Sequence, residues 1–111
     1  MSFERITKNS DYRNVYKKGK STADANLVMY ILKNQLGEEK RFGFSVSKKV
    51  GNAVKRNRIK RVLKEVCRLN QSNLDGSFDM VLVARVAVAD KSYHEIERSF
   101  LSLARRSKLV R

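Results

Sequence analysis

The sequence predicts an α/β (α+β) two-layer sandwich, with one mixed sheet of about four strands and three helices in the order αβββαβα. Three apolar or alternating segments indicate three of these strands, and three segments with apolar residues at helical spacing indicate the helices. The chain has 111 residues, the usual size of one compact domain, so we expect a single domain over residues 1–111. Its 41% apolar content is enough for a core without disulfides or a structural metal.

The first predicted helix is short and has signals at both ends. Ser10 is a candidate N-cap, and Gly19 is placed to end the helix. Between them, Tyr12, Val15 and Tyr16 share one face at helical spacing. We therefore expect a helix that begins at Ser10 and stops at Gly19.

The next two segments indicate strands. Every residue from Leu27 to Leu32 is apolar, which is typical of a strand covered on both faces. Because side chains alternate along a strand, one face would carry Leu27, Met29 and Ile31, and the other Val28, Tyr30 and Leu32. The polar stretch 33–40, which contains Gly37, predicts a turn into a second strand at 41–47, paired antiparallel with the first.

The predicted second strand has two faces of different character. The apolar face carries Phe42, Phe44 and Val46. The opposite face is small and polar, with Gly43, Ser45 and Ser47. A face of small side chains leaves room for another group to lie on it.

The second half of the chain predicts two helices around one strand. The helix at residues 52–69 is apolar on one side and basic elsewhere, and residues 70–77 form a polar loop. The apolar segment 78–83 indicates a central strand, and Ser92 with Glu95 fits a capping box for the last helix. The core stripes of the two helices are Ile59, Val62, Leu63 and Val66 in the first, and Ile96, Phe100 and Leu103 in the second.

The charge of the chain indicates a polyanionic partner. Lys and Arg number 25 against 11 Asp and Glu, which gives a formal charge of +14 and a pI near 10.4. Self-repulsion of this size favours binding to nucleic acid. A membrane surface is the second candidate, but no apolar run approaches the roughly 20 residues of a spanning helix. Because the N-terminus also lacks the apolar stretch of a signal peptide, we expect a cytoplasmic protein.

The positive charge is concentrated around the central helix. Between Lys48 and Arg68 lie nine basic residues and one acid, Glu65. The backbone amides that follow Gly51 and Asn52 could also receive a phosphate. A charge run is often only the solvated face of a helix, but such faces usually mix Glu with Lys. The nearly uniform sign therefore favours polyanion binding, without indicating which polyanion.

One long stretch resembles a known family. Residues 45–61, SVSKKVGNAVKRNRIKR, resemble the signature of the bacterial ribonuclease P protein component, including its Arg-Asn-Arg core at 56–58. The likeness extends to Asp11-Tyr12 and residues 15–19 in the first helix, and to residues 83–85 in the last strand. It implies a left-handed βαβ crossover around the basic helix, which the residue pattern itself does not show because right-handed crossovers dominate in general.

The resemblance also implies partners and site residues. It implies that the basic helix binds the catalytic RNA of ribonuclease P through Lys48, Lys49, Asn52, Arg56, Asn57, Arg58, Lys60, Arg61, Lys64 and Arg68. It implies that a cleft binds the 5′ leader of precursor tRNA through Tyr12, Tyr16, Tyr30, Ser45, Arg56 and Lys60. Relatives often carry phenylalanine at the first two positions, but tyrosine keeps the π face needed for stacking. Their spacing alone favours tyrosines that simply complete the core, and it is the motif and the small face of the second strand that favour a platform, although each ring can serve both.

The sequence shows no protein active site. The acids are scattered, and the closest pairs are Asp75 with Asp79 and Glu95 with Glu97. The single cysteine, Cys67, falls at an apolar helical position and predicts a buried, inert thiol. The resemblance implies that the RNA subunit holds Mg²⁺ and performs hydrolysis, with no organic cofactor and one protein per RNA. Two alternatives stay open: a structural RNA-binding protein of the ribosome or another RNP, and, more weakly, a protein-only endonuclease.

Overall fold

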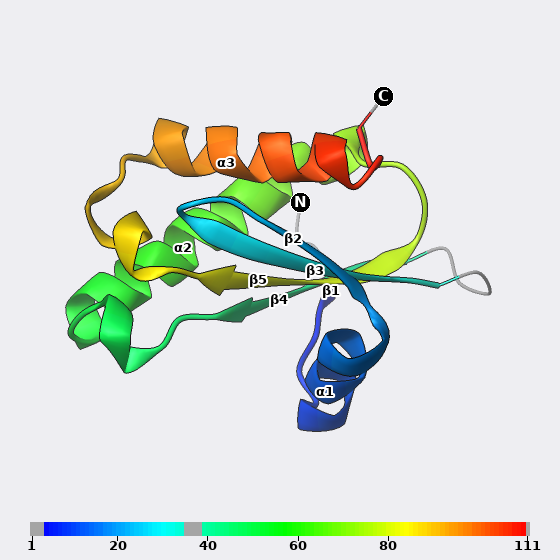
Figure 1. The fold of residues 1–111 in the computed structure, drawn as a ribbon, viewed down its shortest axis with the longest axis horizontal. Helices are drawn as coiled ribbons and strands as arrows, with labels where there is room; N and C mark the ends of the chain where they lie inside the picture. The colour runs from blue at the N-terminus through cyan, green and yellow to red at the C-terminus, as the bar shows by residue number, and fades with distance from the viewer. Residues whose placement is uncertain (1–3, 35–38, 111) are drawn as a thin grey trace.

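The computed structural model describes residues 4–34 and 39–110, which form one mixed sheet and three α-helices (Figure 1). The strands are β1 (Glu4–Arg5), β2 (Lys20–Ala23), β3 (Leu27–Lys33), β4 (Lys40–Ser45) and β5 (Phe78–Ala84). The α-helices are α1 (Asn9–Lys18), α2 (Ala53–Asn70) and α3 (Tyr93–Arg106), with short 3₁₀ helices at Lys48–Val50, Gln71–Asn73 and Val86–Asp90. The predicted α+β class with one mixed sheet and three helices is confirmed, although the described sheet has five strands instead of about four and carries helices on both faces.

The two strands that the sequence did not indicate lie at the edges of the sheet. The strand order is β1-β4-β5-β3-β2. β1 has only two residues, and β2 has the polar sequence KSTA. Neither carries an apolar alternation, because an edge strand buries little side-chain surface.

The predicted antiparallel pairing of residues 27–32 with 41–47 is wrong. β5 lies between β3 and β4, antiparallel to β3 and parallel to β4. As the strand with most of its residues buried, β5 occupies the centre, where both faces are covered, and its central placement is confirmed. The predicted turn residue Gly37 lies outside the described residues.

The helices cover opposite faces of the sheet, with α2 and α3 on one and α1 on the other (Figure 1). The predicted alternation in β3 is confirmed, since Leu27, Met29 and Ile31 belong to the large core beneath α2 and α3. Tyr30 and Leu32 pack instead against a small second core under α1, formed by Ile6, Val15 and Val81. The βαβ unit implied by the resemblance consists of β4, α2 and β5, and its handedness stays an expectation.

The ends of α1 differ in how well local signals predict them. The helix begins at Asn9, with Lys8 at the N-cap and no side-chain cap, so the predicted Ser10 cap is wrong. Backbone bonds from Asp11 and Tyr12 to the Lys8 carbonyl form the first turn instead. Gly19 does end the helix, and a Cβ there would meet the Val15 carbonyl oxygen at 2.5 Å.

The caps of the other two helices are side-chain caps. The Asn52 side chain accepts a hydrogen bond from the Lys55 amide at 2.9 Å and begins α2. The predicted capping box of α3 is confirmed, since the Ser92 hydroxyl accepts from the Glu95 amide at 3.2 Å and donates to its carboxylate. Cys67 is fully buried as predicted, and burial raises the pKa of its thiol.

Candidate RNA interface

Three tyrosines gather on the face of the sheet that α1 covers. Tyr12 and Tyr16 are one helical turn apart, with ring centroids separated by 6.5 Å. Tyr30 comes from β3, and its ring meets Tyr16 edge to face at 4.9 Å. The structure therefore brings together residues from α1 and β3 that the sequence could only group by resemblance. We call Tyr12, Tyr16 and Tyr30, with Ser45 beside them, the tyrosine cluster.

Tyr12 lies on the small face of β4. A Cβ built on Gly43 would lie 2.7 Å from the Tyr12 ring, so only glycine leaves the space that the ring occupies. The Tyr12 hydroxyl also accepts a hydrogen bond from the Phe44 amide at 3.1 Å. The expectation that a group lies on this small face is met by Tyr12 itself, which therefore has a packing role as well as a ring surface.

Tyr16 is the most accessible member of the tyrosine cluster. Its relative exposure is 39%, whereas Tyr12 and Tyr30 are half-buried. Burial of its remaining surface raises the pKa of the Tyr16 hydroxyl, and a hydrogen bond with Ser45 partly offsets that rise. Ser45, on β4, is thus joined to the cluster as expected. Part of the Tyr16 ring is therefore open to solvent among the described residues.

Arg41 connects α1 to the sheet beside this cluster. Its Nε and Nη2 donate to the two carboxylate oxygens of Asp79 on β5 at 2.8 and 2.6 Å, and its Nη1 donates to Asp11 on α1 at 3.3 Å. These bonds, with Asp79 the larger contributor, raise the pKa of the guanidinium. Arg41 was missed by sequence reasoning, because an arginine at a strand start gives no local sign of carboxylates far away in the chain. Of the Asp75 and Asp79 pair noted in the sequence, Asp79 belongs to this ion-pair network.

The basic residues of α2 divide into those with partners in the protein and those directed outward. Arg58 donates to the Lys91 carbonyl at 2.9 Å, and Arg68 is paired with Glu65 one turn earlier on the same helix. Asn52 is used as the helix cap. The predicted RNA-binding residues that are exposed are Lys48, Lys49, Asn52, Asn57 and Arg61.

A second group of cations lies along one side of α2. Burial lowers the pKa of Lys64, and the nearby charges of Arg5 and Lys60 lower it further. Arg5 belongs to β1, so the edge strand extends the basic surface of the helix. Sequence reasoning missed Arg5, since a two-residue strand has no recognisable pattern. The predicted cleft residues Arg56 and Lys60 lie on α2, and no described contact joins them to the tyrosines.

The comparisons with known proteins identify the family. A family model described as Ribonuclease P matches residues 1–108. The chain belongs to the ribonuclease P protein family. The ribonuclease P protein component of Alkaliphilus metalliredigens is 47% identical over 109 residues, covering 98% of this chain and 97% of that protein. The corresponding protein of Clostridium novyi is 49% identical over 107 residues, covering 96% of this chain and 95% of that protein.

Solved ribonuclease P proteins share the fold. The Staphylococcus aureus RNase P protein superimposes with a TM-score of 0.88 at 36% identity, covering 96% of this chain and 97% of that chain. The Thermotoga maritima RNase P protein superimposes with a TM-score of 0.84 at 28% identity, covering 93% of this chain and 96% of that chain. As a ribonuclease P protein component, the chain has ribonuclease P RNA as its partner, and the ribosomal alternative is not favoured.

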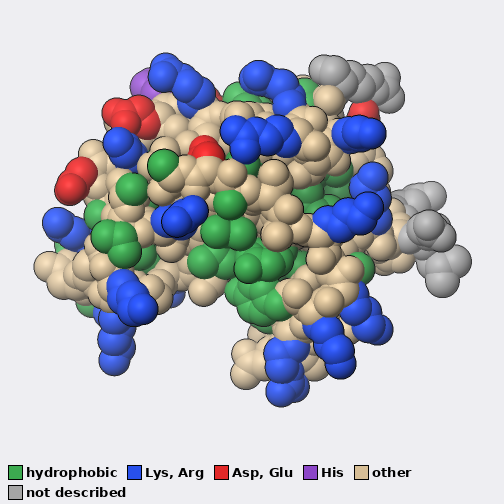
Figure 2. Space-filling view, in the orientation of Figure 1, with side chains coloured by type: hydrophobic (Ala, Val, Ile, Leu, Met, Phe, Trp, Pro, Cys, Tyr) green, Lys and Arg blue, Asp and Glu red, His purple; other side chains and the backbone are tan. Residues whose placement is uncertain are grey.

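The surface of this ribonuclease P protein is predominantly basic (Figure 2). On the face shown, Lys and Arg side chains project around α1 and along the upper and right margins, with few acids among them. Among the described helices, none is both long and apolar enough to span a bilayer. The charge available to an RNA is therefore distributed more widely than α2 alone.

Proposed function

We propose that the chain binds the catalytic RNA of ribonuclease P through α2 and the 5′ leader of precursor tRNA through the tyrosine cluster. In this role it assists endonucleolytic removal of the leader and broadens the range of substrates. The observation that carries the proposal is the exposed Tyr16 ring, held edge to face against Tyr30 beside Ser45. A scaffold protein needs no such aromatic surface for single strands.

Stacking supports the leader part of the proposal. An aromatic ring can stack on any base and contributes roughly 1–3 kcal/mol per stacked base, without requiring a particular sequence. The Tyr12 ring is fixed by Gly43 and by its hydrogen bond to Phe44, so little side-chain entropy is lost when a base stacks on it. Tyr16 offers the larger accessible surface of the two.

The charges of α2 and of the 3₁₀ helix before it support the catalytic-RNA part. The exposed Lys48, Lys49 and Arg61 can neutralise phosphates and release counterions. The buried Nε of Arg56 has no hydrogen-bond partner among the described residues. Because an unpaired buried donor is costly, a phosphate oxygen that reached it would be stabilised. Arg56 is therefore retained among the proposed RNA contacts of α2.

The carboxylates of residues 4–34 and 39–110 do not fit a catalytic Mg²⁺ site. In the described part of the chain, no three His, Cys, Asp or Glu side chains gather as metal ligands, and Asp11 and Asp79 are paired with Arg41. We expect the RNA subunit to hold Mg²⁺ and to perform the hydrolysis, without an organic cofactor. We also expect one protein per RNA and a cytoplasmic location.

A reconstitution assay tests the proposal against its alternatives. The chain is mixed with ribonuclease P RNA and precursor tRNA at low Mg²⁺, with protein-alone and RNA-alone controls. Cleavage at the leader junction should require the RNA and be stimulated by the protein. Cleavage by the protein alone would indicate a protein endonuclease, and binding without stimulation would indicate a structural RNA-binding protein.

A further inference from the structure

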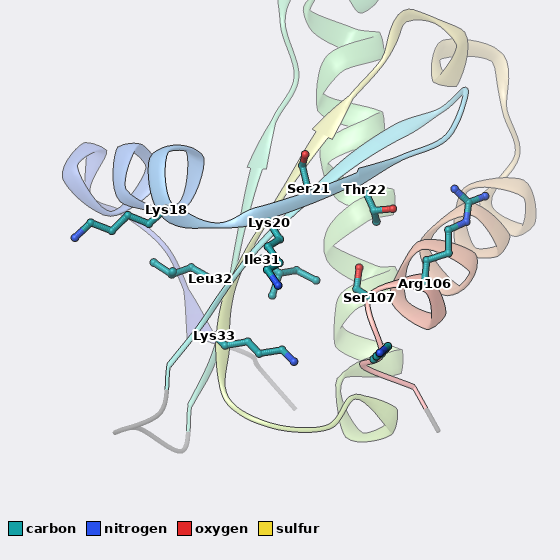
Figure 3. Close-up of a pocket in the computed structure, with 10 residues that line it drawn as sticks. Lys18, Lys20, Ser21, Thr22, Ile31, Leu32, Lys33, Arg106 and Ser107 are labelled. Carbon is teal, nitrogen blue, oxygen red and sulfur yellow. The ribbon is translucent and has the colours of Figure 1, made fainter.

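A basic pocket lies at the edge of the sheet formed by β2, and none of its lining residues belongs to α2 (Figure 3). Its volume is about 610 Å³, within the range of roughly 300–1,000 Å³ that is usual for ligand sites. None of its lining residues is acidic. Its five cations are Lys18, Lys20, Lys33, Arg106 and Lys108, which come from α1, two strands and the end of α3.

Most of these cations have no carboxylate partner. Lys18, Lys20, Lys33 and Lys108 are exposed, and none takes part in the ion pairs formed within residues 4–34 and 39–110. Arg106 differs, because its Nη1 donates to the Ala23 carbonyl at 3.1 Å. In Figure 3 the Lys33 side chain extends from β3 toward the end of α3. The pocket thus concentrates unpaired positive charge from segments far apart in the sequence.

The cations are not explained by the dipole of α3 alone. Basic residues at a helix C-terminus are favourable, which would account for Arg106 and Lys108. Lys20 and Lys33, however, belong to strands. The last carbonyls of α3 are also occupied, since Leu103, Ala104 and Arg105 accept from the amides of residues 107–109. An anion in the pocket would therefore meet few exposed carbonyl groups.

Lys108 has an unusual backbone conformation. Its φ of 61° is the only positive value of a non-glycine residue in the described chain. Glycine is the usual residue at such a helix end, because a Cβ is disfavoured there. A lysine at this position places a charge at the pocket despite its backbone cost, which is consistent with a role for the side chain.

The pocket and the tyrosine cluster meet at neighbouring strands, because Ser21 of the pocket pairs with Tyr30 of the cluster. In the register of the sheet, Gly43, Val81, Tyr30 and Ser21 form one row across β4, β5, β3 and β2. Ser21 lines the pocket, one strand spacing of about 5 Å from Tyr30. Leu32 lies on the face of the tyrosines and Ile31 on the face of α3, and both line the pocket. The pocket therefore curves around the β2 edge at the end of the row opposite Gly43.

We propose that the pocket at the β2 edge binds phosphates of leader nucleotides that lie upstream of those stacked on the tyrosines. The proposal rests on the leader binding proposed above and extends it by a second, electrostatic subsite. A strand that leaves Tyr30 would pass Ser21 on the same face and turn around the β2 edge, where its phosphates would meet Lys20 and Lys33 on the α3 side of the sheet. Because lysines contact phosphates without reading bases, this subsite recognises leader length and not leader sequence.

The test compares two double variants in the assembled holoenzyme. Lys20→Gln/Lys33→Gln removes two charges from the pocket, and the control Lys91→Gln/Arg98→Gln removes two elsewhere, one just before α3 and one in its N-terminal half. The ligands are precursor tRNA with a long leader, precursor tRNA with a leader cut just beyond the tyrosines, and mature tRNA. The pocket variant should bind the long-leader substrate about fivefold to tenfold more weakly, as expected for two exposed charge contacts. The other two ligands and the control variant should show no change.

Three results would overturn the proposal. The first is an unchanged affinity of the pocket variant for the long-leader substrate, and the second is an equal loss of affinity for all three ligands. The third is a loss of affinity for the catalytic RNA in the absence of substrate. This last result would mean that the pocket docks the RNA subunit. Thermal unfolding of each variant excludes a folding defect, and Lys108→Asn gives a second test with a residue that tolerates positive φ. The proposed function is tested separately by Tyr16→Ala with the short leader, so its failure is distinguishable from failure of the pocket.

Discussion

The ring of Tyr12 lies against the Cα of Gly43, and no side chain larger than hydrogen fits between α1 and β4 at this point. The adjacent hydrogen bond from the Phe44 amide to the Tyr12 hydroxyl holds the ring in place. The position of the first tyrosine therefore depends on a glycine 31 residues later in the chain. This relationship couples the stability of the domain to the geometry of the proposed leader site.

Replacing Gly43 with Ala should force Tyr12 out of its place. A Cβ would lie 2.7 Å from the ring, and overpacking of this kind typically costs about 1–3 kcal/mol. Urea unfolding of both proteins measures the difference in the free energy of unfolding. The matched control is Gly43→Ala in a Tyr12→Ala background, where the cost should be smaller because the ring is absent. An equal cost in both backgrounds would show that Tyr12 is not the group that requires glycine.

Replacing Asp79 with Ala should destabilise the protein without slowing the chemical step. Arg41 would lose both of its shortest hydrogen bonds, and leaving a partly buried guanidinium underpaired costs about 1–3 kcal/mol. Single-turnover cleavage by the assembled holoenzyme, under conditions where the protein stays folded, should be unchanged. The same rate is expected for Asp75→Ala, Glu95→Ala and Glu97→Ala. A large loss of rate with folding and assembly intact would assign a catalytic acid to the protein.

Binding to ribonuclease P RNA should fall steeply as salt concentration rises. Each phosphate contact that is lost lowers the slope of log affinity against log salt by about 1. Arg61 is exposed, whereas Arg68 is already paired with Glu65, so Arg61→Gln should flatten the slope more than Arg68→Gln. Filter binding or fluorescence anisotropy across a salt series measures both slopes. A slope near zero for the unmodified protein would rule out the proposed role of α2.

The elements that sequence could predict are those set by local signals. The helix end at Gly19, the capping box at Ser92 and the two faces of β3 all follow from neighbouring residues, and the structure confirms them. The order of strands does not follow from local signals. β5 enters between β3 and β4 after a long helix, and the Arg41 and Asp79 pair that accompanies it joins residues 38 positions apart.

Some features of the candidate site also follow from local sequence signals, whereas others depend on how distant segments pair. Helical spacing alone places Tyr12 and Tyr16 on one face, and the small residues of β4 predict an open surface. The approach of Arg5 to Lys64 depends on the parallel pairing of β1 with β4, which has no sequence pattern. The sequence also does not predict the β2-edge pocket. Its four lysines come from α1, β2, β3 and the residues after α3, and none of them belongs to a recognisable motif.

The most discriminating prediction concerns Tyr16, because it is both accessible and central to the tyrosine cluster. Tyr16→Ala should weaken binding of precursor tRNA by roughly 1–3 kcal/mol, the contribution of one stacked base. Mature tRNA has no leader, so its affinity should stay the same. Both affinities are measured with holoenzyme assembled from each variant, after thermal unfolding and binding to the RNA subunit have been checked.

Tyr16→Phe is the matched control for this experiment, since it keeps the ring and removes only the hydroxyl that contacts Ser45. It should retain most of the affinity for precursor tRNA, because stacking depends on the ring face. Shortening the leader until it no longer reaches the cluster should abolish the difference between Tyr16→Ala and the unmodified protein. Equal losses for precursor and mature tRNA, or a difference that persists without a leader, would mean that Tyr16 is a packing residue or a general RNA contact. In that case Tyr16 would serve only the packing of α1 on the sheet, although its ring is only partly buried.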